Sequence, residues 1–234
     1  MLPEVSRRNA FTLVVTTSPR AWLATSKVLR GYSNIKVALG LHPEIAERKA
    51  GEKGLLLSSI AHARFIGEIG LDGSSRFRSS FALQEDIFVD TVAECERQGG
   101  RVMSIHSRAA ASRVLDILEK YPKAGVPILH WFSGTVGELR RAIDLGCWFS
   151  VGPAMLAARK GCDLTQKIPQ DRLLPETDGP FAALNGSSLM PWQAMEIVPV
   201  LVRLWQTAEG EVQAQLNRNL TELLSIEEGV SRPS

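Results

Sequence analysis

Short runs of apolar, often β-branched residues alternate with longer stretches of helical periodicity along most of the chain. Runs of this kind, ended by glycine or polar residues, are typical of buried strands, whereas apolar residues three or four positions apart are typical of amphipathic helices. Strands that alternate with helices predict βα units around a parallel sheet. The predicted strands cover residues 12–17, 36–42, 65–72, 101–107, 126–131, 147–152 and 173–179.

Helical periodicity fills the intervals between these strands and continues after the last one. Residues 2–9 resemble the end of a helix that leads into the first strand, and Gly146 is placed to end another helix as a left-handed C-cap. No low-complexity segment or linker divides the chain, so we expect one domain over residues 1–226 and a polar tail over residues 227–234. The predicted helices lie within residues 18–32, 81–99, 109–122, 135–146, 191–210 and 211–225.

Seven strands in alternation with helices predict an α/β protein of the TIM (β/α)8-barrel type with the first strand missing. The chain has 234 residues, somewhat fewer than the ~250 typical of such a barrel. The missing strand should either be supplied by residues before Met1 or have been lost, and a loss would expose two strand edges. A doubly wound open sheet is the competing architecture, which alternation alone does not exclude.

Polar residues gather at the predicted carboxyl ends of the strands, where barrels of this type hold their chemistry. Imidazole and carboxylate groups together are common ligands of zinc and other divalent ions. Metal-assisted hydrolysis is the chemistry they indicate, because a bound cation activates water and stabilises charge on the attacked oxygen. The set is His42, Glu68, Asp72, His106, His130 and Asp178, and it holds three of the protein's four histidines.

Each of these residues also has an ordinary structural explanation. His130 could be a hydrogen-bonded core histidine, and Asp178 could cap a turn. Glu68 fits such an explanation poorly, because a carboxylate between apolar residues needs a cation or close donors. The fourth histidine, His62, lies away from any strand end and is assigned no role. Arg76 either borders the site in solvent or meets an anionic substrate.

The composition narrows the class of protein without deciding its function. With 44% hydrophobic and 22% charged residues, it is typical of a soluble globular protein. No apolar run long enough for a membrane span and no leader sequence are visible, so we expect a cytoplasmic protein without membrane contact. Three cysteines without C-x-x-C spacing indicate neither disulfides nor a thiolate zinc site. A net charge of +2 is too small to indicate nucleic acid by itself.

Five ordered blocks resemble the signature of the TatD-type metal-dependent deoxyribonucleases, which are amidohydrolase-like TIM barrels. Five blocks in order over nearly the whole chain are far more specific than one short motif. The resemblance implies that Glu68, His106, His130 and Asp178 bind divalent metal, with Glu68 and Asp178 catalytic. The blocks are GLHP (40–43), GEIGLD (67–72), IHSRAA (105–110), HWFSG (130–134) and ETDGP (176–180).

The same resemblance implies a substrate and further roles. His42 and Arg108 would approach the phosphate of a DNA substrate, and Asp72 would orient a metal ligand. A complete site would hold two ions of Mg²⁺, Mn²⁺ or Zn²⁺ bridged by Glu68. One ion would be bound by Asp178, which also orients or deprotonates water. The other would be bound by His106 and His130.

The family also has an H-x-H pair on its first strand, and this sequence has none. We therefore expect phosphodiester hydrolysis by this chain to be weak or absent. The chain looks nearest to TatD-like proteins of Qat-type anti-phage gene clusters, which implies other defence-complex subunits as partners. Two alternatives stay open: a non-catalytic subunit that docks a partner through an open strand edge, and a small-molecule lactonase or amidase on the same barrel.

Overall fold

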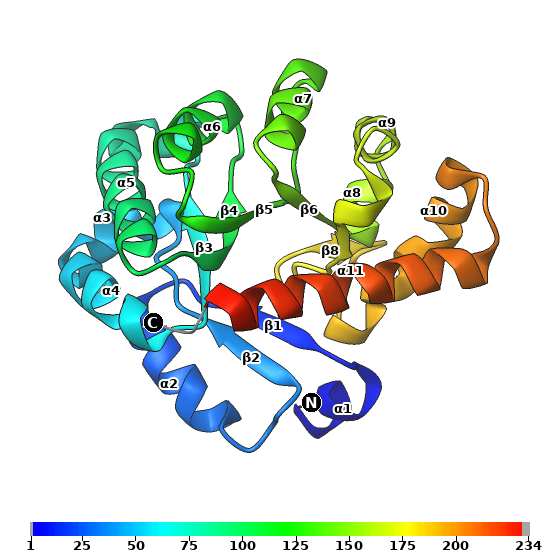
Figure 1. The fold of residues 1–234 in the computed structure, drawn as a ribbon, viewed down its shortest axis with the longest axis horizontal. Coiled ribbons are helices and arrows are strands. Elements are labelled where there is room, and N and C mark those ends of the chain that lie inside the picture. The colour runs from blue at the N-terminus through cyan, green and yellow to red at the C-terminus, as the bar shows by residue number, and fades with distance from the viewer. Residues whose placement is uncertain (1, 231–234) are drawn as a thin grey trace.

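A computed structural model describes residues 2–230 of the chain, and every predicted strand is present in it (Figure 1). Each strand ends before its predicted run does, although His106 and His130 remain the last residues of their strands. The parallel strands are β1 (Thr12–Val15), β2 (Ile35–Ala38), β3 (Phe65–Gly70), β4 (Arg101–His106), β5 (Gly125–His130), β6 (Trp148–Val151) and β7 (Leu173–Pro175). A short antiparallel hairpin, β8 (Ala183–Leu184) and β9 (Ser187–Ser188), was not predicted.

The strands neighbour one another in the order of the sequence. β1 pairs with β2, and β3 to β7 form a second ladder. A bridge between Leu39 and Ile66 joins the two parts. This order has no reversal, which a doubly wound sheet requires, so the TIM-barrel interpretation holds and the open-sheet alternative is wrong. Within residues 2–230, β1 and β7 form no ladder with each other, so the described strands leave the ring open.

Most helices lie outside the curved array of strands, whereas α11 (Glu209–Val230) runs across it and contacts β4 and β7 (Figure 1). Local capping explains several boundaries: Ser18 accepts a hydrogen bond from the Ala21 amide, and Thr135 forms a capping box with Glu138. The helices are α1 (Leu2–Arg8), α2 (Pro19–Leu29), α3 (Ala46–Lys49), α4 (Lys53–Ser59), α5 (Phe81–Arg97), α6 (Ala111–Lys120), α7 (Val136–Asp144), α8 (Pro153–Leu156), α9 (Arg159–Thr165), α10 (Val198–Trp205) and α11 (Glu209–Val230). No helix within residues 2–230 has the length and apolar character needed to cross a bilayer.

The last helix, α11, continues past residue 226 into the segment expected to be a polar tail. Glu227 is buried, and its carboxylate accepts hydrogen bonds from the guanidinium of Arg64 at 2.5 and 2.7 Å. Residues 227–230 are therefore helical, and this contact ties the end of α11 to the loop before β3. The remaining tail residues, 231–234, lie outside the described part of the chain.

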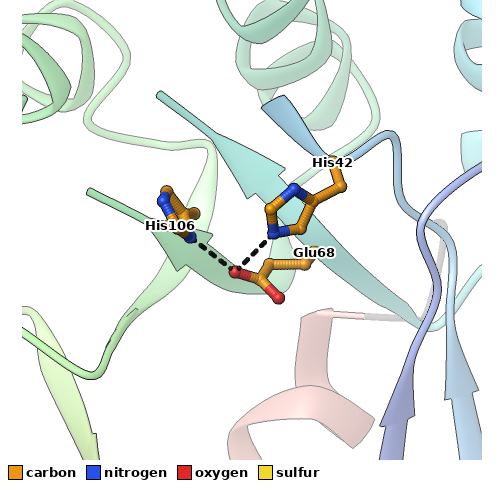
Figure 2. A group of neighbouring side chains, drawn as sticks. All are labelled: His42, Glu68 and His106. Carbon is orange, nitrogen blue, oxygen red and sulfur yellow. Dashed lines mark hydrogen bonds and ion pairs between the residues drawn. The ribbon is translucent and has the colours of Figure 1, made fainter. Parts of the chain in front are cut away.

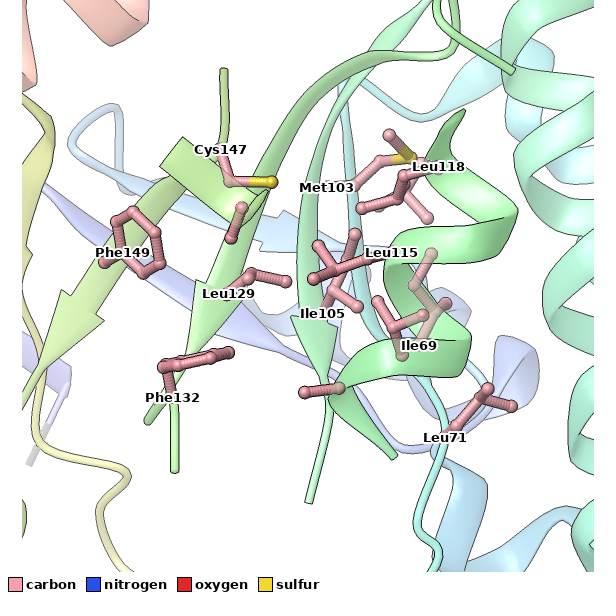
Figure 3. Close-up of a cluster of buried hydrophobic side chains, with 14 of the residues drawn as sticks. Ile69, Leu71, Met103, Ile105, Leu115, Leu118, Leu129, Phe132, Cys147 and Phe149 are labelled. Carbon is pink, nitrogen blue, oxygen red and sulfur yellow. The ribbon is translucent and has the colours of Figure 1, made fainter. Parts of the chain in front are cut away.

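Alternation along the strands separates two hydrophobic layers. The outward-facing side chains pack against the helices, as Met103 and Ile105 do against Leu115 and Leu118 of α6 (Figure 3). The inward-facing side chains of β4 to β7 form a second cluster, into which Leu223 of α11 packs. Along β4 and β5 this inner face changes from apolar to polar: Val102, Ser104, His106 and Val126, Ile128, His130. The period of two thus places both histidines on the inner face at the carboxyl ends.

Candidate metal centre

Glu68 lies at the centre of the polar cluster because β3 is irregular at this residue. The register between β3 and β4 shifts between Ile66 and Ile69, and such an irregularity redirects a side chain. The Glu68 amide donates to the Thr16 carbonyl at 3.2 Å. Gly40 permits this close approach, since a Cβ there would lie 2.4 Å from the Glu68 nitrogen. The resulting side chain is buried, with 6% of the residue exposed.

Two histidines contact the same carboxylate oxygen of Glu68 (Figure 2). His106 Nδ1 lies 3.0 Å and His42 Nε2 3.3 Å from Glu68 Oε1. The other carboxylate oxygen points away from both rings (Figure 2). Burial opposes ionisation of Glu68, but the hydrogen bonds from His106 and His42 outweigh it and hold the pKa well below its ordinary value. Glu68 is therefore a carboxylate at neutral pH.

His42 has a fixed ring orientation because it also caps a short 3-10 helix. Its Nδ1 accepts a hydrogen bond from the Glu44 amide at 3.2 Å. A ring nitrogen that accepts carries no proton, so in the neutral ring the proton lies on Nε2. That Nε2–H then donates to Glu68. This tautomer makes His42 a hydrogen-bond donor toward the site, as a contact to a substrate phosphate requires.

His106 is held between two carboxylates. Its Nε2 lies 2.9 Å from Asp72 Oδ2, while Nδ1 faces Glu68. Asp72 is fully buried and accepts a hydrogen bond from the Ser74 amide at 2.9 Å. Burial disfavours charge on both partners, but their mutual hydrogen bond outweighs it, raising the pKa of His106 to about 9 and lowering that of Asp72 to about 2. Asp72 thus fixes the ring of His106 from behind.

Asp178 completes the cluster from the loop after β7. Its backbone is left-handed, with φ of 52°, a conformation in which a non-glycine residue is strained and which is common at functional sites. Asp178 Oδ1 lies 3.8 Å from His130 Nε2. Burial raises the pKa of Asp178 to about 6, with the positive charge of His130 acting in the opposite direction.

Glu176 and Ser150 also belong to this cluster, although the sequence analysis did not select them. Glu176 Oε2 lies 2.5 Å from His130 Nδ1 and accepts a hydrogen bond from Ser150 Oγ at 2.5 Å. Burial disfavours the charged ring of His130, but the charge and hydrogen bond of Glu176 raise its pKa to about 10. Alternation could have revealed both residues: Ser150 faces inward on β6, and Glu176 follows inward-facing Leu174 by two positions.

The donor atoms form groups that fit divalent cations. Ligand atoms of His42, Glu68 and His106 lie within 4.8 Å of one another, as do those of Glu68, His130 and Asp178. Imidazole nitrogen and carboxylate oxygen suit Zn²⁺ or Mn²⁺. The raised pKa values of His106 and His130 mean that both rings hold a proton near these carboxylates. A divalent cation would supply the same positive charge in place of the two protons. Glu68 is shared between the groups, as the resemblance implied, but the geometry places His130 with Asp178 rather than with His106.

Other residues from the sequence analysis lie outside these groups. Arg108 is exposed on the loop after β4, where its carbonyl accepts a hydrogen bond from the Gly73 amide. His62 is exposed on a 3-10 helix. A hollow of about 250 Å³ lies next to the cluster. Glu44 lines this hollow, and its carboxylate also lies within 4.8 Å of a ring nitrogen of His106. Arg76 lines the same hollow, and its guanidinium stacks on Phe77 at 5.2 Å from the ring centroid.

Comparison with known proteins gives a consistent result. A family model described as TatD related DNase matches residues 5–225. The uncharacterized metal-dependent hydrolase YjjV of Escherichia coli strain K12 is 28% identical over 222 residues, covering 89% of this chain and 84% of that protein. A 3'-5' ssDNA/RNA exonuclease TatD of Erwinia tasmaniensis is 31% identical over 149 residues, 61% of this chain and 57% of that protein. The crystal structure of YjjV shares the fold, with a TM-score of 0.83 at 23% identity, covering 95% of this chain and 91% of that one.

Proposed function

The chain belongs to the TatD-related DNase family of metal-dependent hydrolases, and on that premise we propose that it cleaves phosphodiester bonds of DNA. The observation that carries the proposal is the position of Glu68. Its buried carboxylate lies between two groups of candidate ligand atoms, with His106 in one and with His130 and Asp178 in the other, and such sharing is suited to a pair of cations. A relative named as an exonuclease of single-stranded DNA and RNA supports a single-stranded substrate.

The residues of the cluster divide the work of hydrolysis. A bound divalent cation would supply an activated water and stabilise charge on the scissile phosphate. Glu68 and His106 would hold one cation, and Glu68, His130 and Asp178 would hold the second. The Nε2–H of His42 donates to a phosphate oxygen. Asp178 accepts the proton of the attacking water, a role that requires a carboxylate within hydrogen-bond reach of that water.

The hollow beside the cluster offers a path for the nucleotide next to the scissile bond. Arg48 and Arg76 can contact its phosphate, and Phe77 offers a ring for stacking with its base. Arg108, on its exposed loop, can also meet a phosphate. These contacts position the substrate, whereas Glu68 and Asp178 act on the reacting atoms.

The direct test is cleavage of an end-labelled single-stranded DNA oligonucleotide with Mn²⁺ or Mg²⁺. Chelation with EDTA should abolish cleavage, and Asp178→Asn should lower the rate by about 10²- to 10⁴-fold because the proton acceptor is lost. Asp144→Asn is the matched control, since Asp144 is exposed at the end of α7. Cleavage that resists EDTA, or an Asp178→Asn variant as active as Asp144→Asn, contradicts the proposal.

The same assay addresses what the sequence left open. Weak cleavage by this chain remains a prediction, and the rate measured with saturating Mn²⁺ tests it directly. A parallel panel of lactone and amide substrates tests the alternative of a small-molecule hydrolase, which metal dependence alone does not separate from a nuclease. We propose DNA as the substrate, and a defence-complex partner stays a prediction that co-purification can test.

A further inference from the structure

The carboxylate of Glu176 lies behind His130, on the side away from the cation group. Glu176 Oε2 lies 2.5 Å from His130 Nδ1, whereas His130 Nε2 lies 3.8 Å from Asp178. The side chains of Glu176 and His130 are each 13% exposed, so little water competes for this contact. A neutral imidazole that donates from Nδ1 keeps the lone pair of Nε2 for a cation.

Neighbouring elements fix the carboxylate of Glu176 in place. Its backbone amide donates to the Val151 carbonyl at 3.0 Å, which holds the residue against the end of β6. Ser150 Oγ donates to the same oxygen, Oε2, that faces His130. Gly152 leaves the necessary space, since a Cβ there would lie 3.4 Å from Glu176 Cγ and 3.1 Å from its carbonyl oxygen. Glu176 therefore has little freedom to turn away from the ring.

We propose that Ser150 and Glu176 form a positioning relay that holds His130 as the Nδ1–H tautomer and so presents Nε2 to a divalent cation. A carboxylate behind a ligating histidine orients the ring and makes it a stronger ligand. The inference rests on the proposed metal site but not on the identity of the substrate. Neither residue ligates the cation in this account.

The second histidine has the opposite arrangement, which makes the inference specific. Asp72 contacts Nε2 of His106 and leaves Nδ1 toward Glu68. Two carboxylates, those of Asp72 and Glu176, thus lie behind two histidines and contact different ring nitrogens. We expect His106 to ligate through Nδ1 and His130 through Nε2.

The other oxygen of Glu176 argues against a role in packing alone. Oε1 is buried and has no hydrogen-bond partner among the described residues. A buried oxygen without a donor destabilises the fold, so a smaller or apolar residue would serve packing better. The contact to His130 gives a reason for a carboxylate at this position.

Isothermal titration of the metal-free protein with Mn²⁺ tests the relay without any substrate. Glu176→Gln should weaken binding by about 10- to 100-fold, the usual effect of removing such a partner. Ser150→Ala should weaken it less, by about three- to tenfold, because the carboxylate stays but loses one of its two donors. Ser104→Ala is the matched control, a buried serine on the inner face of β4, and should bind as the wild type does.

Nitrogen-15 NMR of the histidine rings supplies a reading that a merely structural role would not change. In the Zn²⁺-loaded wild type, His130 should carry its proton on Nδ1 and bind through Nε2, and His106 should show the reverse. In Glu176→Gln the His130 signals should report a mixture of tautomers in the metal-free protein, with His106 unchanged.

The outcomes separate this inference from the proposed function. If the wild type binds no Mn²⁺, the metal site itself is wrong. If the wild type binds but Glu176→Gln and Ser150→Ala bind equally well, or if His130 ligates through Nδ1, only the relay is overturned. Should Glu176→Gln fail to fold by thermal melting, Ser150→Ala and the wild-type NMR spectrum still decide the matter.

Discussion

The affinity of the cluster for a divalent cation should rise steeply with pH, because its histidines hold protons when no cation is bound. The pKa of His130 lies near 10, since the charge of Glu176 outweighs the effect of burial. The pKa of His106 lies near 9, since hydrogen bonds to Asp72 and Glu68 outweigh burial there. A cation must displace the proton from each ring that it engages. Binding and proton release are therefore linked.

The group of Glu68, His130 and Asp178 gives the size of the effect. A pH of 7 lies about three units below the pKa of His130, so the ring holds its proton. At about 1.4 kcal/mol per unit, displacing that proton costs about 4 kcal/mol. One proton exchanged per cation means an affinity that rises about tenfold per pH unit between pH 7 and 8. Below its pKa of about 6, Asp178 also holds a proton, so the slope there should approach about a hundredfold per unit.

Calorimetric titration with Mn²⁺ at pH 5.5, 7 and 8 measures both slopes, and buffers of different ionisation enthalpy count the released protons. His62→Gln is the control, because its exposed ring lies outside the cluster and its loss should leave the slopes unchanged. An affinity that is flat between pH 7 and 8 in the wild type would refute the assignment of a protonated His130 beside Glu176.

Three further predictions concern stability and substrate contact. Gly40→Ala should lower the free energy of unfolding, measured by urea titration, by more than about 2 kcal/mol, because its Cβ would lie 2.3 Å from the Thr16 carbonyl oxygen. Gly54→Ala is the control: a Cβ at this position in α4 has nothing within 4 Å, so the variant should be neutral or stabilising in the same titration. Arg76→Ala should raise KM for an oligonucleotide and leave kcat unchanged in steady-state kinetics, and an unchanged KM would remove Arg76 from the substrate path. With EDTA present, protonated His130 stabilises the folded state fully below the pKa of about 6.5 that it has in the unfolded chain, and this stabilisation is lost as pH rises toward 10. The melting temperature of the wild type should therefore fall between pH 6.5 and 10. A fall equally large in His130→Gln would contradict the assignment.

The strands and the main ligands follow from local patterns that the sequence displays directly. Alternation along β4 and β5 places His106 and His130 on the inner face with no knowledge of tertiary contacts. The barrel interpretation needed only the alternation of elements and is confirmed by the fold of its structural relatives. Glu68 could be selected because a carboxylate within an apolar run needs compensation.

Long-range contacts determine what the sequence could not predict. The sharing of Glu68 between two ligand groups depends on the register shift in β3 and on the contact between Glu68 and Thr16, 52 positions apart. The extension of α11 depends on Arg64, which lies 163 positions from Glu227. Glu176 was not predicted, because Asp178 is the carboxylate next to the glycine turn after the last strand, although alternation from Leu174 indicates position 176.

The most direct test of the account is a crystal structure of the protein with Zn²⁺, using anomalous scattering to locate the ion. The account predicts an ion about 2.1 Å from a Glu68 carboxylate oxygen and from His130 Nε2, with Asp178 also a ligand. Glu176 should remain on Nδ1 of the same ring. An ion bound elsewhere, or no anomalous peak in this cluster at saturating Zn²⁺, would contradict the central claim that Glu68 is the shared ligand of a catalytic metal site.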